Sequence, residues 1–260
     1  MTEQEGRVAH HIVRADGRVL SSRRATEQFY AASTVKLAVL AALAREVAQD
    51  TADLADTLPS RDTFSSVVDG APDYRLIPDD VDHGMPAPGE PMTLAELARR
   101  MIVISSNEAT NILFARLGQP AVGQVLSDAG AEGVSMGRQY GDFAAAKQLG
   151  PVNLVSAAGL TSLMSAVITG RLCPDPDLNA WMIGLLEAQE FPALSRSLPA
   201  GVRWGSKSGS VDGVRHDFAF FGEPGPDALV VAVCTSGYEH EAAGELITAI
   251  GAAAYDLAGV

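Results

Sequence analysis

The chain has 260 residues, with 19 Lys and Arg against 32 Asp and Glu and a formal net charge of −13. Nucleic-acid affinity rests largely on Lys and Arg replacing phosphate counterions, so this excess of acid argues against a DNA- or RNA-binding function. Hydrophobic residues make up 47% of the chain and charged residues 20%, which is enough apolar sequence to bury a full core and excludes wholesale disorder. The length suits one large domain or two interleaved ones.

The first residues carry no targeting or membrane signal. Residues 1–5 are polar and acidic, without the basic start and apolar stretch of a secretory signal. The apolar run nearest to them, residues 37–44, is far shorter than the roughly 20 residues that cross a bilayer. We therefore expect a cytoplasmic protein that is neither exported nor anchored in a membrane.

Predicted strands lie at the two ends of the chain and predicted helices between them. Residues 8–14, the turn pair Asp16-Gly17 and residues 18–21 indicate a β-hairpin. From residue 33 to about 197 apolar residues recur mostly at helical spacing, interrupted by a Pro-, Asp- and Gly-rich loop at 59–91. Further elements are predicted as strands at 202–207, 218–221 and 229–234, and a last helix at about 239–257.

This order predicts an α+β fold with an antiparallel sheet, flanked by helices, into which an all-helical lobe is inserted. Residues 1–32 and 200–260 would build the sheet lobe, and residues 33–199 the helical lobe. The best crevice in such an arrangement lies at the seam between the two lobes, so we expect the active site there.

The segment that begins at Ser33 combines a candidate nucleophile with a lysine in an otherwise apolar helix. The residues after Ser33 are apolar nearly all the way round the helix, which is typical of a buried helix, and yet Lys36 lies inside it. Side chains three residues apart share a helix face, within reach of a hydrogen bond. A lysine amine can take a serine proton only when desolvation or cationic neighbours lower its pKa. An N-cap serine beside a lysine that reaches solvent is the structural alternative.

Two further segments support a catalytic interpretation. Ser105-Ser106-Asn107 follows an apolar run, and Lys207-Ser208-Gly209-Ser210 lies at the end of a predicted strand. With Ser33-Thr-Val-Lys36, they resemble in order the Ser-x-x-Lys, Ser-Asp-Asn and Lys-Thr-Gly motifs of class A β-lactamase-like and penicillin-binding serine hydrolases. The resemblance covers nearly the whole chain and implies a β-lactamase/transpeptidase-like fold.

The resemblance also implies a role for each matched position. Ser33 would be acylated, with Lys36 as its base and with Ser105 relaying a proton to the leaving nitrogen. Lys207 would support Ser105 and attract a substrate carboxylate. The remaining substrate-binding candidates are Asn107, Ser208, Gly209, Ser210 and Arg215. The backbone N–H of Ser210 would form an oxyanion hole together with that of Ser33. For Arg215, a solvated charge on a strand is an equal alternative.

The sequence departs from that family at two places. Ser106 stands where the middle motif normally has Asp, so we expect a differently arranged hydrogen-bond network there. Class A β-lactamases carry a loop Glu that activates the deacylating water. The corresponding residues 137–150 contain no Glu, and Asp142 is their only carboxylate. Asp142 is thus a possible deacylation base, with turn formation as the alternative.

From these observations we expect a serine hydrolase that cleaves an amide, β-lactam or peptide-like, through an acyl-enzyme on Ser33, without metal or organic cofactor. Its partner would be a small amide or ester substrate that bears a carboxylate. An esterase, a D-amino-acid peptidase or a biosynthetic transacylase with weak or no β-lactamase activity remains open because the loop Glu is missing. A non-catalytic protein that only binds acyl ligands is a further alternative.

Overall fold

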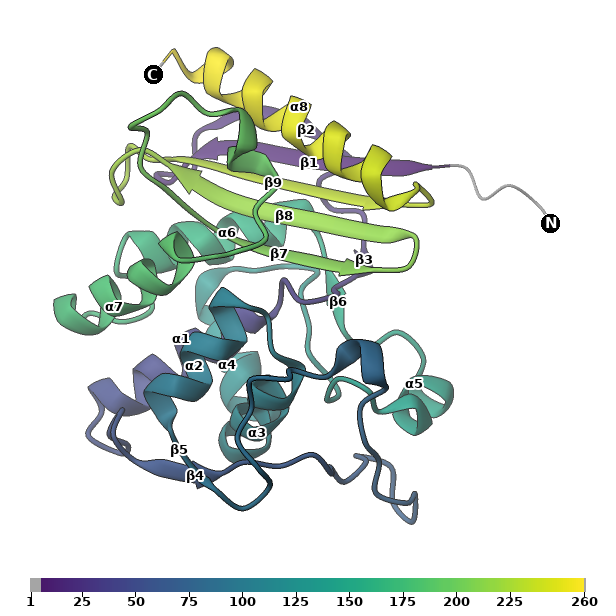
Figure 1. Cartoon of the computed structure of the whole chain (residues 1–260). Coiled ribbons are helices and arrows are strands. Elements are labelled where there is room, and N and C mark those ends of the chain that lie inside the picture. The colour runs from purple at the N-terminus through teal and green to yellow at the C-terminus, as the bar shows by residue number, and fades with distance from the viewer. Residues whose placement is uncertain (1–5, 260) are drawn as a thin grey trace.

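A five-stranded antiparallel sheet with the strand order β2-β1-β9-β8-β7 forms one layer of the molecule (Figure 1). The computed structural model describes residues 6–259. The strands of this sheet are β1 (Arg7–Arg14), β2 (Val19–Arg23), β7 (Trp204–Val211), β8 (Val214–Phe221) and β9 (Leu229–Ser236). Because β1 pairs with both β2 and β9, the two ends of the chain share one sheet, and the predicted α+β class is confirmed.

Helices cover both faces of this sheet. The face that carries Val231 and Val233 packs against Ile247 of α8 (His240–Ala258), the C-terminal helix that Figure 1 shows above the sheet. The other face of β9 carries Val230 and Ala232, which join the core of the helical region. The chain alternates in this way because successive side chains of a strand point to opposite faces. β9 is therefore buried along its whole length, with apolar neighbours on both sides.

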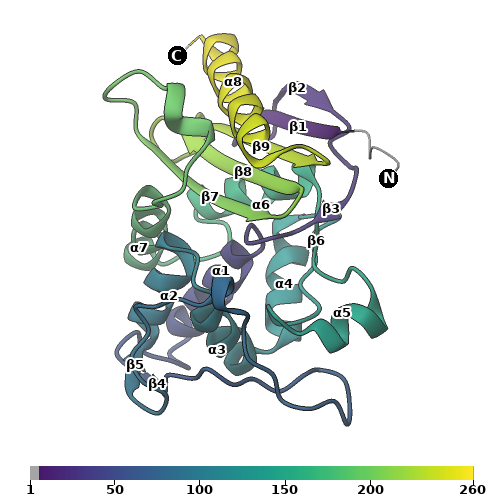
Figure 2. The same ribbon diagram turned by 45° about the vertical axis from the view of Figure 1, so that its right-hand side comes forward.

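The helical region lies below the sheet, and the buried helix α1 runs through its middle (Figure 2). The helices between β2 and β7 are α1 (Lys36–Ala48), α2 (Leu94–Val103), α3 (Asn107–Leu117), α4 (Gln119–Ala129), α5 (Phe143–Leu149), α6 (Ala157–Ile168) and α7 (Pro176–Glu187), with the 3-10 turns η1 (Pro78–Asp80) and η2 (Leu194–Ser197). Within α1, every residue from Lys36 to Ala44 is buried, as the apolar sequence predicts.

Four short strands were not predicted. β3 (Phe29–Tyr30) pairs with β6 (Leu154–Val155), and β4 (Thr57–Pro59) pairs with β5 (Pro91–Thr93). Each has only two or three residues, too few to display the alternation by which a strand is recognised in a sequence. The second pair closes the predicted loop at its two ends. Within residues 6–259, no helix has both the length and the apolar character needed to cross a membrane.

Candidate active site

Ser33 lies in a tight turn that leads into α1 rather than inside the helix. The turn is held by backbone hydrogen bonds from Thr34 N to the Ala31 oxygen at 3.2 Å and from Lys36 N to the Ser33 oxygen at 3.4 Å. Ala32 adopts a φ of 44°, in the left-handed region that a residue with a Cβ enters at a cost of about 1–3 kcal/mol. Within residues 6–259, no acceptor binds the Ser33 N–H, which therefore remains free for a ligand.

Ser33 opens into a cleft of about 420 Å³ that is lined by residues of both the sheet and the helical region. Ser105, Ser106 and Asn107, at the start of α3, line the same cleft. The end of β7 contributes the segment 208–210. The three predicted motifs thus meet in one cavity, although Ser105 and Lys207 alone are 102 residues apart in sequence.

Gly209 is the point at which the sheet touches the nucleophile segment. A Cβ on Gly209 would lie 2.7 Å from Ser33 N, closer than real Cβ atoms approach, and 3.0 Å from Thr34 N, tighter than most Cβ contacts. The glycine therefore lets β7 pass directly beside the Ser33 N–H. A side chain here would separate the two backbones that the oxyanion hypothesis needs side by side.

The Lys36 amine lies below the cleft, completely buried, and its hydrogen bonds lead to the start of α3. Its Nζ donates to the Ser105 backbone oxygen at 2.7 Å and to Asn107 Oδ1 at 2.8 Å, and lies 3.3 Å from Ser105 Oγ. The expected hydrogen bond to Ser33 does not occur in this structure, where the Lys36 amine bonds to the start of α3 instead.

Burial lowers the pKa of Lys36 well below its ordinary value, and the charge of Lys207 lowers that pKa further. A neutral amine has two N–H groups and one lone pair. The Ser105 carbonyl and the Asn107 amide oxygen occupy the two N–H groups. The lone pair is then available to accept a proton, so the environment suits Lys36 to act as a base.

The Ser105 hydroxyl lies between two lysine side chains. Its Oγ is 3.3 Å from Lys36 Nζ and accepts a hydrogen bond of 3.0 Å from Lys207 Nζ. Ser105 itself has a φ of 62°, another strained position at the cleft. The pKa of Lys207 is lowered to about 7, chiefly by burial, whereas Asp217 raises it. A hydroxyl between a low-pKa amine and an ammonium is well placed to pass a proton.

Tyr140 is a site residue that the sequence did not identify. Its ring lies against the Lys36 amine, 4.5 Å from Nζ to the ring centroid, and its hydroxyl donates a 2.7 Å hydrogen bond to the Ala32 oxygen. Asn111 fixes the loop on its other side by bonding the Tyr140 N–H and oxygen at 2.8 and 2.9 Å. The only sequence signal is its place within residues 137–150, where a carboxylate was sought.

Asp142, the possible deacylation base, is not among the residues that line the cleft. Its buried carboxylate caps α5 by accepting from Ala145 N at 2.9 Å, and it binds Ser66 Oγ and Val67 N at 2.9 and 3.0 Å. These contacts give it a structural role, the turn-forming alternative, joining the 59–91 loop to the start of α5.

Arg215 also does not reach the cleft. It pairs with Ser210 across the β7–β8 ladder, and directly opposed residues project from the same face of a sheet. That face is covered by α8, where Arg215 Nη1 donates to the His240 oxygen at 2.8 Å and Ser210 Oγ contacts His240 Nδ1 at 3.3 Å. The substrate-binding prediction for the Arg215 side chain therefore lacks the geometry it requires.

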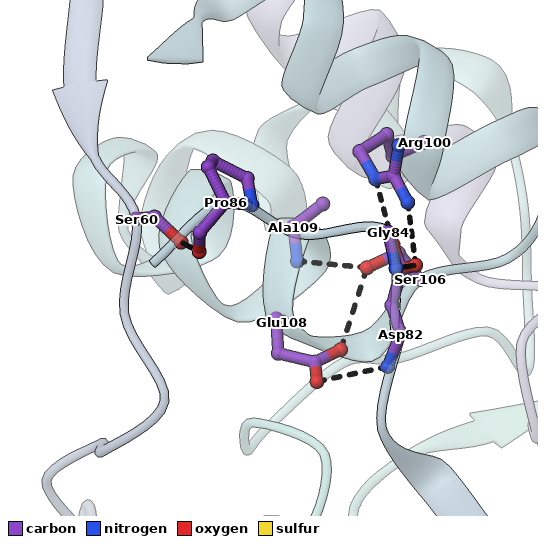
Figure 3. A network of polar contacts seen from close by, with 8 residues as sticks. All are labelled: Ser60, Asp82, Gly84, Pro86, Arg100, Ser106, Glu108 and Ala109. Carbon is purple, nitrogen blue, oxygen red and sulfur yellow. Dashed lines mark hydrogen bonds and ion pairs between the residues drawn. The ribbon is translucent and has the colours of Figure 1, made fainter. Parts of the chain in front are cut away.

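Ser106 belongs to a polar network that fixes one wall of the cleft (Figure 3). Its Oγ caps α3 by accepting from Ala109 N at 3.2 Å and lies 3.4 Å from Glu108 Oε2. Glu108 in turn accepts from Asp82 N at 3.0 Å, and Asp82 accepts from Arg100 Nε at 2.7 Å. With Ser106 at this position, the network ties the segment after η1 to α2 and α3.

Within the described residues, no group of three or more His, Cys, Asp or Glu side chains is placed to hold a metal ion.

Comparisons with known proteins identify the family and the fold. The profile of the beta-lactamase enzyme family matches residues 2–258. The crystal structure of a beta-lactamase from Sphaerobacter thermophilus superposes with a TM-score of 0.81 at 28% identity, covering 98% of this chain and 92% of that one. An ancestral class A β-lactamase has the same fold, with a TM-score of 0.76 at 24% identity and coverage of 95% and 92%. Comparison with curated proteins found no match. The chain belongs to the beta-lactamase family of serine hydrolases.

Proposed function

We propose that the protein transfers the acyl group of a small amide or ester to Ser33 and then releases it. One observation carries the proposal. The Ser105 hydroxyl lies 3.3 Å from Lys36 Nζ and 3.0 Å from Lys207 Nζ, in the cleft into which Ser33 opens. A hydroxyl held between two buried lysine nitrogens serves no evident purpose in stability, because desolvating them is costly.

The acylation step follows from the charges of the two lysines. Ser33 Oγ attacks the carbonyl carbon while its proton passes to the neutral Lys36 amine. The negative oxygen that forms is stabilised by the Ser33 and Ser210 N–H groups. The bond from carbon to the leaving nitrogen or oxygen then breaks, and the leaving atom takes a proton from Ser105, which the Lys36 ammonium replaces. The products are an ester on Ser33 and a free amine or alcohol.

Deacylation is expected to be slow. The ring of Tyr140 covers the Lys36 amine, and Asp142 is occupied as a helix cap. Neither supplies a carboxylate that could activate water beside the ester. The acyl-enzyme would then last long enough to be released by Lys36 and water, or by an amine or alcohol acceptor. This favours a peptidase, esterase or transacylase over an efficient β-lactamase.

A carboxylate on the substrate would be attracted by Lys207, a buried residue of β7. Because the side chains of Arg215 and Ser210 face α8 instead of the cleft, this attraction would come from Lys207. We therefore propose that the site depends less on a substrate carboxylate than a site with two cationic side chains would.

The test is mass spectrometry of the protein after incubation with a chromogenic β-lactam and with a p-nitrophenyl ester. We expect one acyl group per chain on the peptide that contains Ser33, and none on Ser33→Ala. The exposed Ser22 provides the matched control, since Ser22→Ala removes a surface hydroxyl of β2 and should be labelled as the parent is.

The rate of product release distinguishes an enzyme from a non-catalytic protein that only binds acyl ligands. A burst of chromophore equal to the protein concentration, followed by slow turnover that an added amine accelerates, would support an acyltransferase. Labelling with no turnover, even with acceptors present, would instead support the acyl-binding alternative. Turnover by Ser33→Ala at the parental rate would refute the proposal.

A further inference from the structure

The wall of the cleft opposite β7 carries an unused carboxylate. Asp80 is the last residue of η1, the single dark-blue turn below the end of β7 in Figure 1, and it lines the cleft together with Ser33 and Asn107. Its side chain is half-buried. Within residues 6–259, no hydrogen bond and no ion pair reaches its carboxylate.

The neighbouring acid shows what a structural carboxylate looks like here. Asp82, two residues further on, is held by Arg100 through both oxygens, at 2.7 and 2.5 Å, and anchors the wall to α2. Asp80 takes no part in this anchoring. The wall is therefore fixed without Asp80, and its carboxylate is presented to the cleft by a segment that other residues hold in place.

Nothing in the described part of the chain neutralises Asp80 permanently. Burial raises its pKa and the charge of Asp79 raises it too, whereas Lys36 lowers it. The pKa of Lys36, however, is itself well below its ordinary value, so the nearest amine is not a lasting counter-ion. A half-buried carboxylate in this position gains by meeting a cation from solution.

The rest of the cleft fits a substrate with both charges. Lys207, a residue of β7, provides positive charge next to Ser105, and Arg215 is turned to α8. Phe191, with 54% of its surface exposed, adds an apolar rim. The cleft thus has its positive charge at β7, its negative charge at η1 and an apolar side chain on its lining.

We propose that Asp80 is a specificity-determining residue that binds an ammonium group of the substrate, so that the cleft selects amides bearing an amine as well as a carboxylate. This rests on the acyl-transfer function proposed above. A carboxylate–ammonium hydrogen bond in a half-open cleft should raise the acylation rate constant about tenfold.

Three penicillins that differ only in the group on the side-chain α-carbon test this directly. Benzylpenicillin has hydrogen there, ampicillin an ammonium group and carbenicillin a carboxylate. The rate constant for acylation of Ser33 is measured with each by mass spectrometry, at pH 6.5, where an α-amino group is protonated. We expect ampicillin to react about tenfold faster than benzylpenicillin, and carbenicillin to react more slowly than both.

Variants assign this order to Asp80. Asp80→Asn should acylate with ampicillin and benzylpenicillin at similar rates. Asp73→Asn removes the same charge from an exposed position of the same loop, outside the cleft, and should keep the parental order. In the parent protein, added salt should also reduce the preference for ampicillin, a readout that needs no variant.

The outcomes separate the two proposals. Equal acylation of Ser33 by all three penicillins would overturn the role of Asp80 and leave the acyl-transfer function standing. That role would also be overturned if Asp80→Asn keeps the parental order, or if Asp73→Asn loses it. No adduct with any of the three, and none with the nitrophenyl ester, would overturn both.

Discussion

Replacing Gly209 with alanine tests whether the nucleophile and the sheet must touch. The new Cβ would lie 2.7 Å from Ser33 N and 3.1 Å from the Ala32 Cβ, whereas ordinary contact begins at 3.4 Å. Neither side can yield freely. β7 is hydrogen-bonded to β8 along eight residues, and the Ser33 segment is held by the hydroxyl of Tyr140 on the Ala32 oxygen. The gap must nevertheless open by several tenths of an ångström.

The expected loss is mainly catalytic. An error of this size in the oxyanion site, or the loss of one donor from it, lowers the acylation rate constant by roughly 10²- to 10³-fold. Overpacking costs about 1–3 kcal/mol of unfolding free energy, and each kcal/mol lowers the Tm by about 2–4 °C in a chain of this size. We therefore expect Gly209→Ala to remain folded, with a Tm several degrees lower, and to acylate Ser33 very slowly.

The assay follows the Ser33 adduct by mass spectrometry and unfolding by calorimetry. Gly184→Ala is the matched control, because Gly184 lies in α7 with no atom within 4 Å of the added Cβ. It should raise the unfolding free energy by about 0.5–1 kcal/mol and leave acylation unchanged. Acylation by Gly209→Ala within twofold of the parent would refute the contact argument.

Three further predictions concern Lys207, Tyr140 and Asp142. The pKa of Lys207 is lowered to about 7, so its ammonium is present below that pH and the acylation rate should fall as the pH rises through about 7. In Lys207→Arg, whose side chain keeps its charge, this fall should occur at a higher pH. A flat rate profile of the parent between pH 5 and 9 would contradict the assignment. Tyr140→Phe leaves the Ala32 oxygen without the donor that the Tyr140 hydroxyl provides. The unfolding free energy should therefore drop by about 1–3 kcal/mol in denaturant titrations, and acylation of Ser33 should be slower. Unchanged stability would show that this hydrogen bond does not hold the turn. Asp142→Ala removes the cap of α5 and should lower the unfolding free energy by about 1–3 kcal/mol in the same titration, while the acyl group leaves Ser33 at the parental rate. If the acyl group instead left Ser33 ten times more slowly at unaltered stability, Asp142 would be identified as the deacylation base.

The sequence by itself determined the elements with strong periodicity and the motifs that contain several unusual residues. The hairpin at Asp16-Gly17, the three C-terminal strands and the buried helix after Ser33 were all predicted, because each is long enough for the spacing of apolar residues to distinguish strand from helix. The same local signal placed Lys36 inside a buried helix, which is where its lowered pKa originates.

Directions across the fold were decided only by the tertiary structure. Whether Arg215 faces the cleft or α8 depends on its register with Ser210, and a shift of one residue reverses every side chain of a strand. Asp142 and Tyr140 lie in the same loop, yet which of them reaches Lys36 depends on contacts with Ser66 and Asn111, far away in sequence. Such choices depend on long-range packing, and local sequence patterns carry no information about it.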